Sequence, residues 1–215
     1  MKTKSKALLL TLCAVLLVAA SVMGTMAYLT SNDEVVNTFT VGSVNIKLDE
    51  AKVDDDGKAD NTVPRVEANS YKLLPGHTYD KDPMVTVLKG SEESYIKMTV
   101  TFSKASELDA IFAPTGADLT SIFNGYDSAN WIYKDVTTDT TANTRTYEFW
   151  YKETVDAPTA DVALDALFDS ITVPGSITKE QLATIKGMTI TVNAYAIQAD
   201  GFANAEAAWA AYDAQ

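Results

Sequence analysis

Residues 95–102, Tyr-Ile-Lys-Met-Thr-Val-Thr-Phe, alternate strictly between apolar and polar side chains after the first position. Apolar side chains occupy the even positions from Ile96 to Phe102, and polar ones, beginning with Lys97, occupy the odd positions. Successive side chains of a β-strand point to opposite faces of its sheet. The pattern therefore predicts a strand with one face in a core and the other in solvent.

Period-two patterns recur on both sides of this stretch. Trp131–Val136 and Thr144–Tyr151 flank a segment of Thr, Asp, Ala and Asn, which predicts a hairpin. A Gly inside a strand pattern suggests a bulge or bend, as at Gly42. Further strands are expected at residues 37–48, 83–88 and 188–197.

Short helical patterns lie between the strands. Ala105–Phe112 has apolar residues at helical spacing, and Leu119, Ile122 and Phe123 repeat that signature. Thr178–Gln181 has the form of a capping box, and Gly187 would end the helix that follows. A last apolar stripe, expected to dock on the sheets but also able to serve a partner, comprises Phe202, Ala205, Trp209 and Tyr212.

Many strands, short connecting helices and no alternating strand–helix rhythm predict a mainly β protein. We expect a jelly-roll-like antiparallel β-sandwich with a C-terminal helix, formed by one domain over residues 37–215. The most polar stretch, Asp49–Asn61, is expected to be a loop between strands.

The N-terminal residues have the pattern of a secretory signal. Three lysines without an acid precede an apolar run from Ala7 to Ala20, and small residues follow. The predicted signal peptide is residues 1–27, cut between Ala27 and Tyr28. An uncleaved anchor is the alternative, although the apolar run is near the lower limit for spanning a bilayer.

Charge and residue counts exclude several function classes. The chain carries 17 basic and 29 acidic residues; removing residues 1–27 with their three lysines leaves 14 against 29, a net charge of −15. Such a surface repels nucleic acids and anionic membranes. Cys13 would leave with the signal, so catalysis by a thiol is disfavoured. His77 is the sole histidine, which disfavours zinc sites and Ser–His hydrolases. No catalytic residues are therefore assigned.

Two weak metal candidates remain. Asp54, Asp56 and Asp60 surround Gly57 and could hold calcium through oxygen ligands, but a solvated acidic loop is the favoured interpretation because the EF-hand spacing fails. His77 could join Asp80 and Asp82 around a metal, but a surface turn is favoured there too. No cofactor is therefore expected beyond weakly bound calcium.

Aromatic residues are concentrated in the predicted hairpin. Aromatic side chains on one sheet face can stack sugars, although in strands they more often fill cores. A carbohydrate-binding surface is therefore kept as an alternative function for five residues: Trp131, Tyr133, Tyr147, Trp150 and Tyr151.

Three segments, in order, resemble one family. The first, residues 24–50, contains Asn37-x-Phe39-x-x-Gly42-x-Val44-x-Ile46-x-Leu48 after the predicted cut. The second consists of Leu74-Pro75-Gly76, Lys81–Val85 and Tyr95–Lys97, and the third is Ile190–Phe202. On these motifs the chain resembles the TasA/camelysin family of secreted matrix proteins of Gram-positive bacteria. The resemblance covers the chain at intervals, and residues 103–176 match only loosely.

The resemblance implies a jelly-roll sandwich at the cell surface or in the biofilm matrix, released by a dedicated signal peptidase of the SipW type. It also implies fibres, in which residues 28–36 of one subunit complete the sheet of another, with Tyr28, Leu29, Val35 and Val36 as anchors. The partners would be further copies or related matrix proteins. Alternatively, residues 28–36 form an edge strand of their own domain.

Two other functions remain open. One is a cell-surface module that binds polysaccharide or protein. The other is the secreted peptidase activity that the name camelysin carries, which the single histidine and the absence of cysteine after the signal do not support.

Overall fold

The computed structural model describes residues 6, 11–16, 42–112 and 123–214. The chain divides into two units, residues 1–41 and residues 42–215. In the first unit residues 11–16 are helical. None of the helices in the described residues is long and apolar enough to cross a membrane. The predicted cleavage site at Ala27 and Tyr28 and the segment 28–36 lie outside the described residues.

The second unit is mainly β, with several antiparallel sheets, as predicted. β1 (Ile46–Asp49), β3 (Met84–Val87) and β9 (Val162–Ala163) form one sheet, and β2 (Thr78–Asp80), β10 (Ser170–Thr172) and β5 (Phe123–Asn124) form another. A third has the order β11-β4-β7-β6, and β8 also pairs with β4. Its strands are β11 (Ile190–Gln198), β4 (Ser91–Ser103), β7 (Thr144–Tyr151), β6 (Trp131–Asp139) and β8 (Val155–Ala157).

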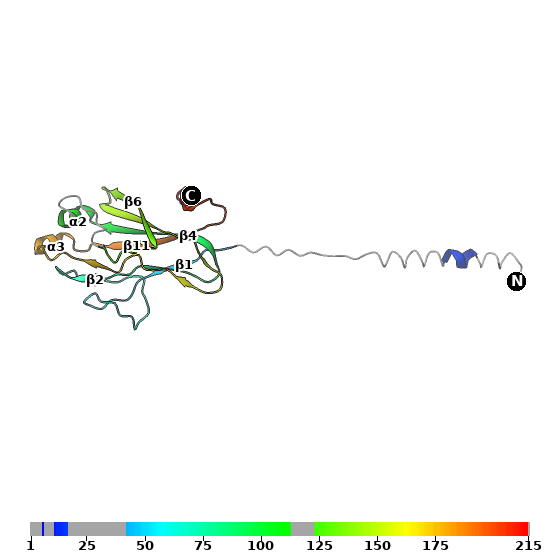
Figure 1. Cartoon of the computed structure of the whole chain (residues 1–215), viewed down its shortest axis with the longest axis horizontal. Helices are drawn as coiled ribbons and strands as arrows, with labels where there is room; N and C mark the ends of the chain where they lie inside the picture. The colour runs from blue at the N-terminus through cyan, green and yellow to red at the C-terminus, as the bar shows by residue number, and fades with distance from the viewer. Residues whose placement is uncertain (1–5, 7–10, 17–41, 113–122, 215) are drawn as a thin grey trace. The chain divides into compact units, whose positions relative to one another are not determined.

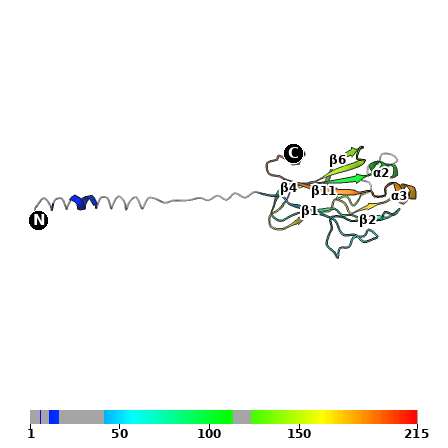
Figure 2. The ribbon, with the colours of Figure 1, turned by 180° about the vertical axis from the view of Figure 1, so that it is seen from behind.

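Two layers of strands enclose one core. β1 and β2 lie in one layer, and β4, β6 and β11 lie in the other (Figure 1), as the view from behind also shows (Figure 2). Side chains from both layers meet in a single apolar cluster, to which Tyr79 and Val85 contribute from one side and Met98 and Phe149 from the other. The even residues of β4 from Ile96 to Phe102 are fully buried in it, which confirms the prediction for this strand.

The predicted hairpin is present and longer than expected. β6 and β7 pair antiparallel from Trp131↔Tyr151 to Asp139↔Thr144, with an irregularity between Tyr133 and Asp135. Thr137 and Thr138, which were assigned to the connecting segment, belong to β6 instead. The ladder with β7 extends through both residues, and Thr is favoured in strands, so a polar composition did not end the strand here.

Two of the predicted helices are present, although the second ends at Thr184, before the expected Gly187. α2 is Ala105–Phe112, with Leu108 fully buried. α3 is Lys179–Thr184, and its capping box forms: the Thr178 hydroxyl accepts from the amide of Gln181 at 3.2 Å, while the Gln181 side chain accepts from the amide of Thr178 at 2.9 Å.

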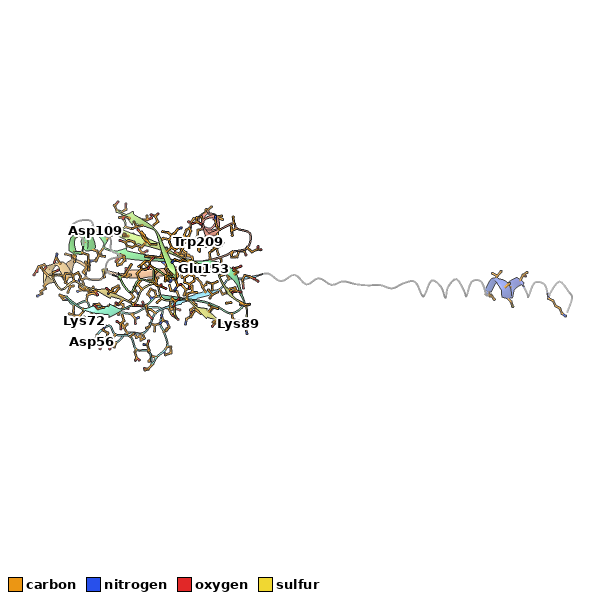
Figure 3. All side chains as sticks on the ribbon, in the orientation of Figure 1. Asp56, Lys72, Lys89, Asp109, Glu153 and Trp209 are labelled. Atoms are coloured by element: carbon orange, nitrogen blue, oxygen red, sulfur yellow. The ribbon has the colours of Figure 1, made fainter. Side chains whose placement is uncertain are left out.

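The C-terminal helix docks on the sheet, as expected. α4 is Ala205–Asp213 and carries Trp209, which Figure 3 labels. Trp209 is 1% exposed. The ring of Trp209 lies 4.6 Å from the ammonium of Lys97 on β4, which also lies near the rings of Tyr195 and Tyr212. Lys97 was predicted to face solvent, and this expectation was wrong, because α4 covers that part of the outer face of the sheet.

Two further expectations need correction. Phe123 is in β5 rather than in a helix, and it stacks on Phe168 in the core with ring centroids 4.3 Å apart; Leu119 and Ile122 lie outside the described residues. In the described part of residues 37–48, the strand begins at Ile46. Gly42 is not in the left-handed region, and the Glu92 side chain lies so close that a Cβ at residue 42 would be 2.8 Å from its Cγ.

Candidate strand-accepting groove

Two edge strands border one side of the domain without pairing to each other. β1 pairs with β3, and β11 pairs with β4. β1 and β11 are close neighbours in space, yet neither has a second strand partner within the described ranges 42–112 and 123–214. An edge strand carries a row of backbone donors and acceptors that an added strand can use.

The backbone groups that β11 leaves open belong to its core-facing residues. In an antiparallel pair, alternate residues direct their N–H and C=O groups to the same neighbour. The amide of Ser103 donates to the carbonyl of Thr189, and the amide of Ala199 donates to the carbonyl of Glu93, so odd residues of this stretch bond to β4. The even residues from Ile190 to Ala196 therefore turn their N–H and C=O groups toward the open edge.

The side chains of these even residues are incompletely covered. Ile190, Val192, Ala194 and Ala196 pack on the core but are only half-buried, unlike their fully buried counterparts on β4. A cavity of about 810 Å³ lies beside the first two, with buried Ile171 and other apolar side chains in its lining. The sheet edge thus presents apolar side chains together with backbone groups that no other described strand pairs.

α3 and the residues after it form part of the groove wall. Leu182 contributes apolar surface, and the exposed lysines Lys179 and Lys186 also line the cavity. The capping box fixes where this helix begins, and Gly187, with φ of 75°, allows the chain to turn back into β11. This wall of the groove therefore presents both an apolar surface, from Leu182, and positive charge, from Lys179 and Lys186.

Charged side chains fix the β1 side of the groove. The Arg65 guanidinium donates to the Asp49 carboxylate at 2.6 Å and to the Asp82 carboxylate at 2.7 Å. Burial alone would raise the pKa of Asp49, but hydrogen bonds and charge from Lys47 and Arg65 outweigh it and hold that pKa below its ordinary value. The loop that carries Arg65 is thereby held against β1.

A second polar cluster lies deeper in the groove. The Lys81 ammonium lies 2.6 Å from the Glu50 carboxylate, and both side chains are more than 90% buried. Asn69 donates to the other oxygen of Glu50 at 3.0 Å. Burial and the charge of Glu50 raise the pKa of the neighbouring Tyr71, whose hydroxyl donates to the carbonyl of Asp80. All four of these side chains line the cavity.

The calcium candidates do not come together. The Asp54 carboxylate accepts from the amides of Asp56 and Lys58 within its own turn, and the Asp60 carboxylate accepts from Thr62. No group of three acidic, His or Cys side chains with metal-binding geometry exists among the residues that the structure describes.

The second metal candidate is also dispersed. His77 is exposed and stacks on Tyr79 with ring centroids 6.2 Å apart. Asp80 bonds to Lys58 and to the amide of Ala59, while Asp82 bonds to Arg65. The two carboxylates therefore serve as links between loops.

The hairpin aromatics do not form one exposed surface. Trp131 and Tyr147 are buried in the core, and the Trp131 indole donates to the carbonyl of Asp165 at 3.0 Å. Trp150 lies beneath the ammonium of Lys134 at 4.0 Å and beside Trp209. Tyr133 alone of the five is among the exposed large hydrophobic residues.

The groove itself was missed by sequence reasoning. β11 was predicted as a strand over residues 188–197, but a hydrophobic pattern does not record how many neighbours a strand has. The predicted anchors Tyr28, Leu29, Val35 and Val36 lie outside the described residues. No protein-family model matches the chain, and no curated protein or solved structure matches it.

Proposed function

We propose that the chain is a secreted, non-enzymatic structural protein that assembles into extracellular fibres, with a jelly-roll-like sandwich as its subunit. Residues 28–36 of one copy add a strand in the groove of the next. The observation that carries this proposal is the edge of β11, where apolar side chains lie beside the cavity and the backbone has no partner strand among residues 42–112 and 123–214 other than β4.

The size of the donor segment suits this site. Residues 28–36 number nine, as do the residues of β11 from Ile190 to Gln198. In extended form nine residues reach about 30 Å, so a single added strand can follow the whole edge. Main-chain hydrogen bonds would supply affinity, and Tyr28, Leu29, Val35 and Val36 would supply apolar contacts.

Charge supports the same pairing. The segment 28–36 carries Asp33 and Glu34 and no basic residue. Lys179 and Lys186 line the groove and are exposed. Of the acidic residues there, Asp49 is paired with Arg65 and Glu50 with Lys81, while Glu67 is exposed. A head-to-tail contact of this kind does not close on itself, so repetition produces a filament.

A groove variant with a matched control tests the proposal. Val192→Asp places a charge on the core-facing side of β11, where the added strand would pack; Asn193→Asp places the same charge on the adjacent exposed position. We expect electron microscopy of the chain from Tyr28 to show filaments for the parent and Asn193→Asp, and few or none for Val192→Asp.

Circular dichroism of both variants checks that each remains folded. Filaments of equal number and length in a folded Val192→Asp variant would contradict the proposal. Monomers in the parent under all salt conditions would favour a cell-surface binding module instead.

A further inference from the structure

Three side chains in the groove combine a nucleophile, a proton carrier and an acyl group. Lys81 follows β2, Glu50 follows β1, and Asn69 lies in the loop between these strands. The two oxygens of the Glu50 carboxylate have different partners: the Lys81 nitrogen at 2.6 Å and the Asn69 amide nitrogen at 3.0 Å. One carboxylate thus lies between an amine and a side-chain amide. The amine could attack the amide carbon and displace the amide nitrogen.

From this arrangement we propose that Lys81 and Asn69 form an intramolecular isopeptide bond, with Glu50 as the catalytic residue that carries the proton. Disulfides stabilise many extracellular domains, but Cys13 is the only cysteine in the sequence and lies in the predicted signal. An amide bond between side chains would supply a covalent link without sulfur. The proposal is independent of fibre assembly, because the bond forms within one copy.

The surroundings hold the reacting groups in place. The backbone of Glu50 exchanges two hydrogen bonds with Val66, both of 2.8 Å. The amide of Val53 donates to the Asn69 side-chain oxygen at 3.0 Å. A donor at that oxygen stabilises the negative charge that develops when a nucleophile attacks the carbonyl carbon. The side chains of Glu50 and Lys81 are 7% and 8% exposed, so protein atoms cover most of their surface.

The step balances without any added reagent. Glu50 accepts a proton from the Lys81 ammonium, and the neutral amine attacks Cγ of Asn69 to form a new C–N bond. The protonated Glu50 then gives its proton to the Asn69 side-chain nitrogen, the old C–N bond breaks, and ammonia leaves. The products are a secondary amide and one ammonia, which takes up the remaining proton as ammonium; no oxidation or reduction occurs.

Mass spectrometry of the purified protein, expressed as the full chain and exported, tests the bond. We expect the denatured chain to be lighter than its sequence by the mass of one ammonia. Proteolysis should then release a branched peptide that joins the fragments containing Asn69 and Lys81, and this species should survive reducing agents.

Variants separate the proposed bond from other losses of ammonia. Lys81→Arg keeps a cation beside Glu50 but removes the nucleophilic amine, and Glu50→Gln keeps the shape but removes the proton carrier; both should show the full sequence mass. Lys72→Arg, at an exposed lysine of the same loop, should retain the loss.

Two results would overturn the proposal. A parent chain at full sequence mass, with Lys81 in an ordinary linear peptide, would show that the three side chains form only an ion pair and hydrogen bonds. Loss of ammonia that persists in Lys81→Arg would indicate that an asparagine has cyclised with its own backbone instead.

Discussion

At the scale of single residues, two glycines in the same conformation have different surroundings. Gly57 and Gly90 have φ of 76° and 86°, which strains any residue with a side chain. A Cβ at residue 57 would lie 2.3 Å from Cδ1 of Tyr79, whereas a Cβ at residue 90 would have no atom within 4 Å. The Tyr79 ring is buried, and its hydroxyl bonds to Lys72 and Leu74, so it cannot easily yield.

This difference gives a paired prediction for stability. Gly90→Ala should lower the free energy of unfolding by about 1–2 kcal/mol through backbone strain alone. Gly57→Ala should lower the free energy of unfolding by about 1–3 kcal/mol more, because its methyl group also clashes with the Tyr79 ring. Urea unfolding of both variants measures the two effects, and equal losses would contradict the packing described around Tyr79.

Asp49 should contribute to stability in a pH-dependent way. Its pKa in the folded state is below the ordinary value of 3.8, so its contribution is present at neutral pH and is lost as the pH falls through the folded pKa. Asp49→Asn should therefore lower the free energy of unfolding by roughly 1–3 kcal/mol at pH 7 and by much less in acid. Asp55→Asn, at an exposed residue, is the control. An equal loss from Asp49→Asn at pH 7 and pH 2 in thermal unfolding would contradict this account.

Local sequence patterns predicted which face of a strand a residue occupies, but they did not predict what covers that face. The alternation in β4 correctly placed Lys97 opposite Met98. That Lys97 is buried depends on α4, more than 100 residues away in the sequence, which places Trp209 above it. Covering of this kind is set by tertiary packing, and a period-two pattern carries no record of it.

At the scale of elements, the cap of α3 is the clearest case of local control. α3 has only six residues and none of them is buried, so the capping box must contribute much of what defines its start. Thr178→Ala should lower the free energy of unfolding by about 1 kcal/mol and loosen this wall of the groove. Thr184→Ala, at the last residue of the helix, is the matched control. Hydrogen exchange at the amide of Gln181 that is unchanged by Thr178→Ala would contradict this role.

The positions of most described elements could be predicted, whereas their neighbours in the sheets could not. α2 begins and ends at the expected residues because its apolar spacing is local. β11 was also located, but its open edge depends on strand pairing: among the described residues β4 is its strand partner, and β1 pairs with β3 instead. Strand neighbours depend on the whole chain, and this is why the groove had no signature in the sequence.

At the scale of the whole molecule, charge should control assembly. Without residues 1–27 the chain has a net charge of −15, so copies repel one another at low ionic strength. Added salt shortens the screening length to about 8–10 Å near physiological concentrations. We expect filaments to form faster in 150 mM than in 10 mM sodium chloride, as followed by light scattering. A rate that falls with added salt would indicate that attraction between charges dominates the contact.

The central claim is that residues 28–36 of one copy lie along β11 of another. The chain from Tyr28 contains no cysteine, so pairs of cysteines can be introduced freely. The most direct measurement places one cysteine at Asn193 and a second at each position from 28 to 36 in turn, then analyses the oxidised proteins on denaturing gels. The account predicts ladders of covalent multimers for a subset of positions. Cross-links confined to single chains, or none at any position, would contradict it.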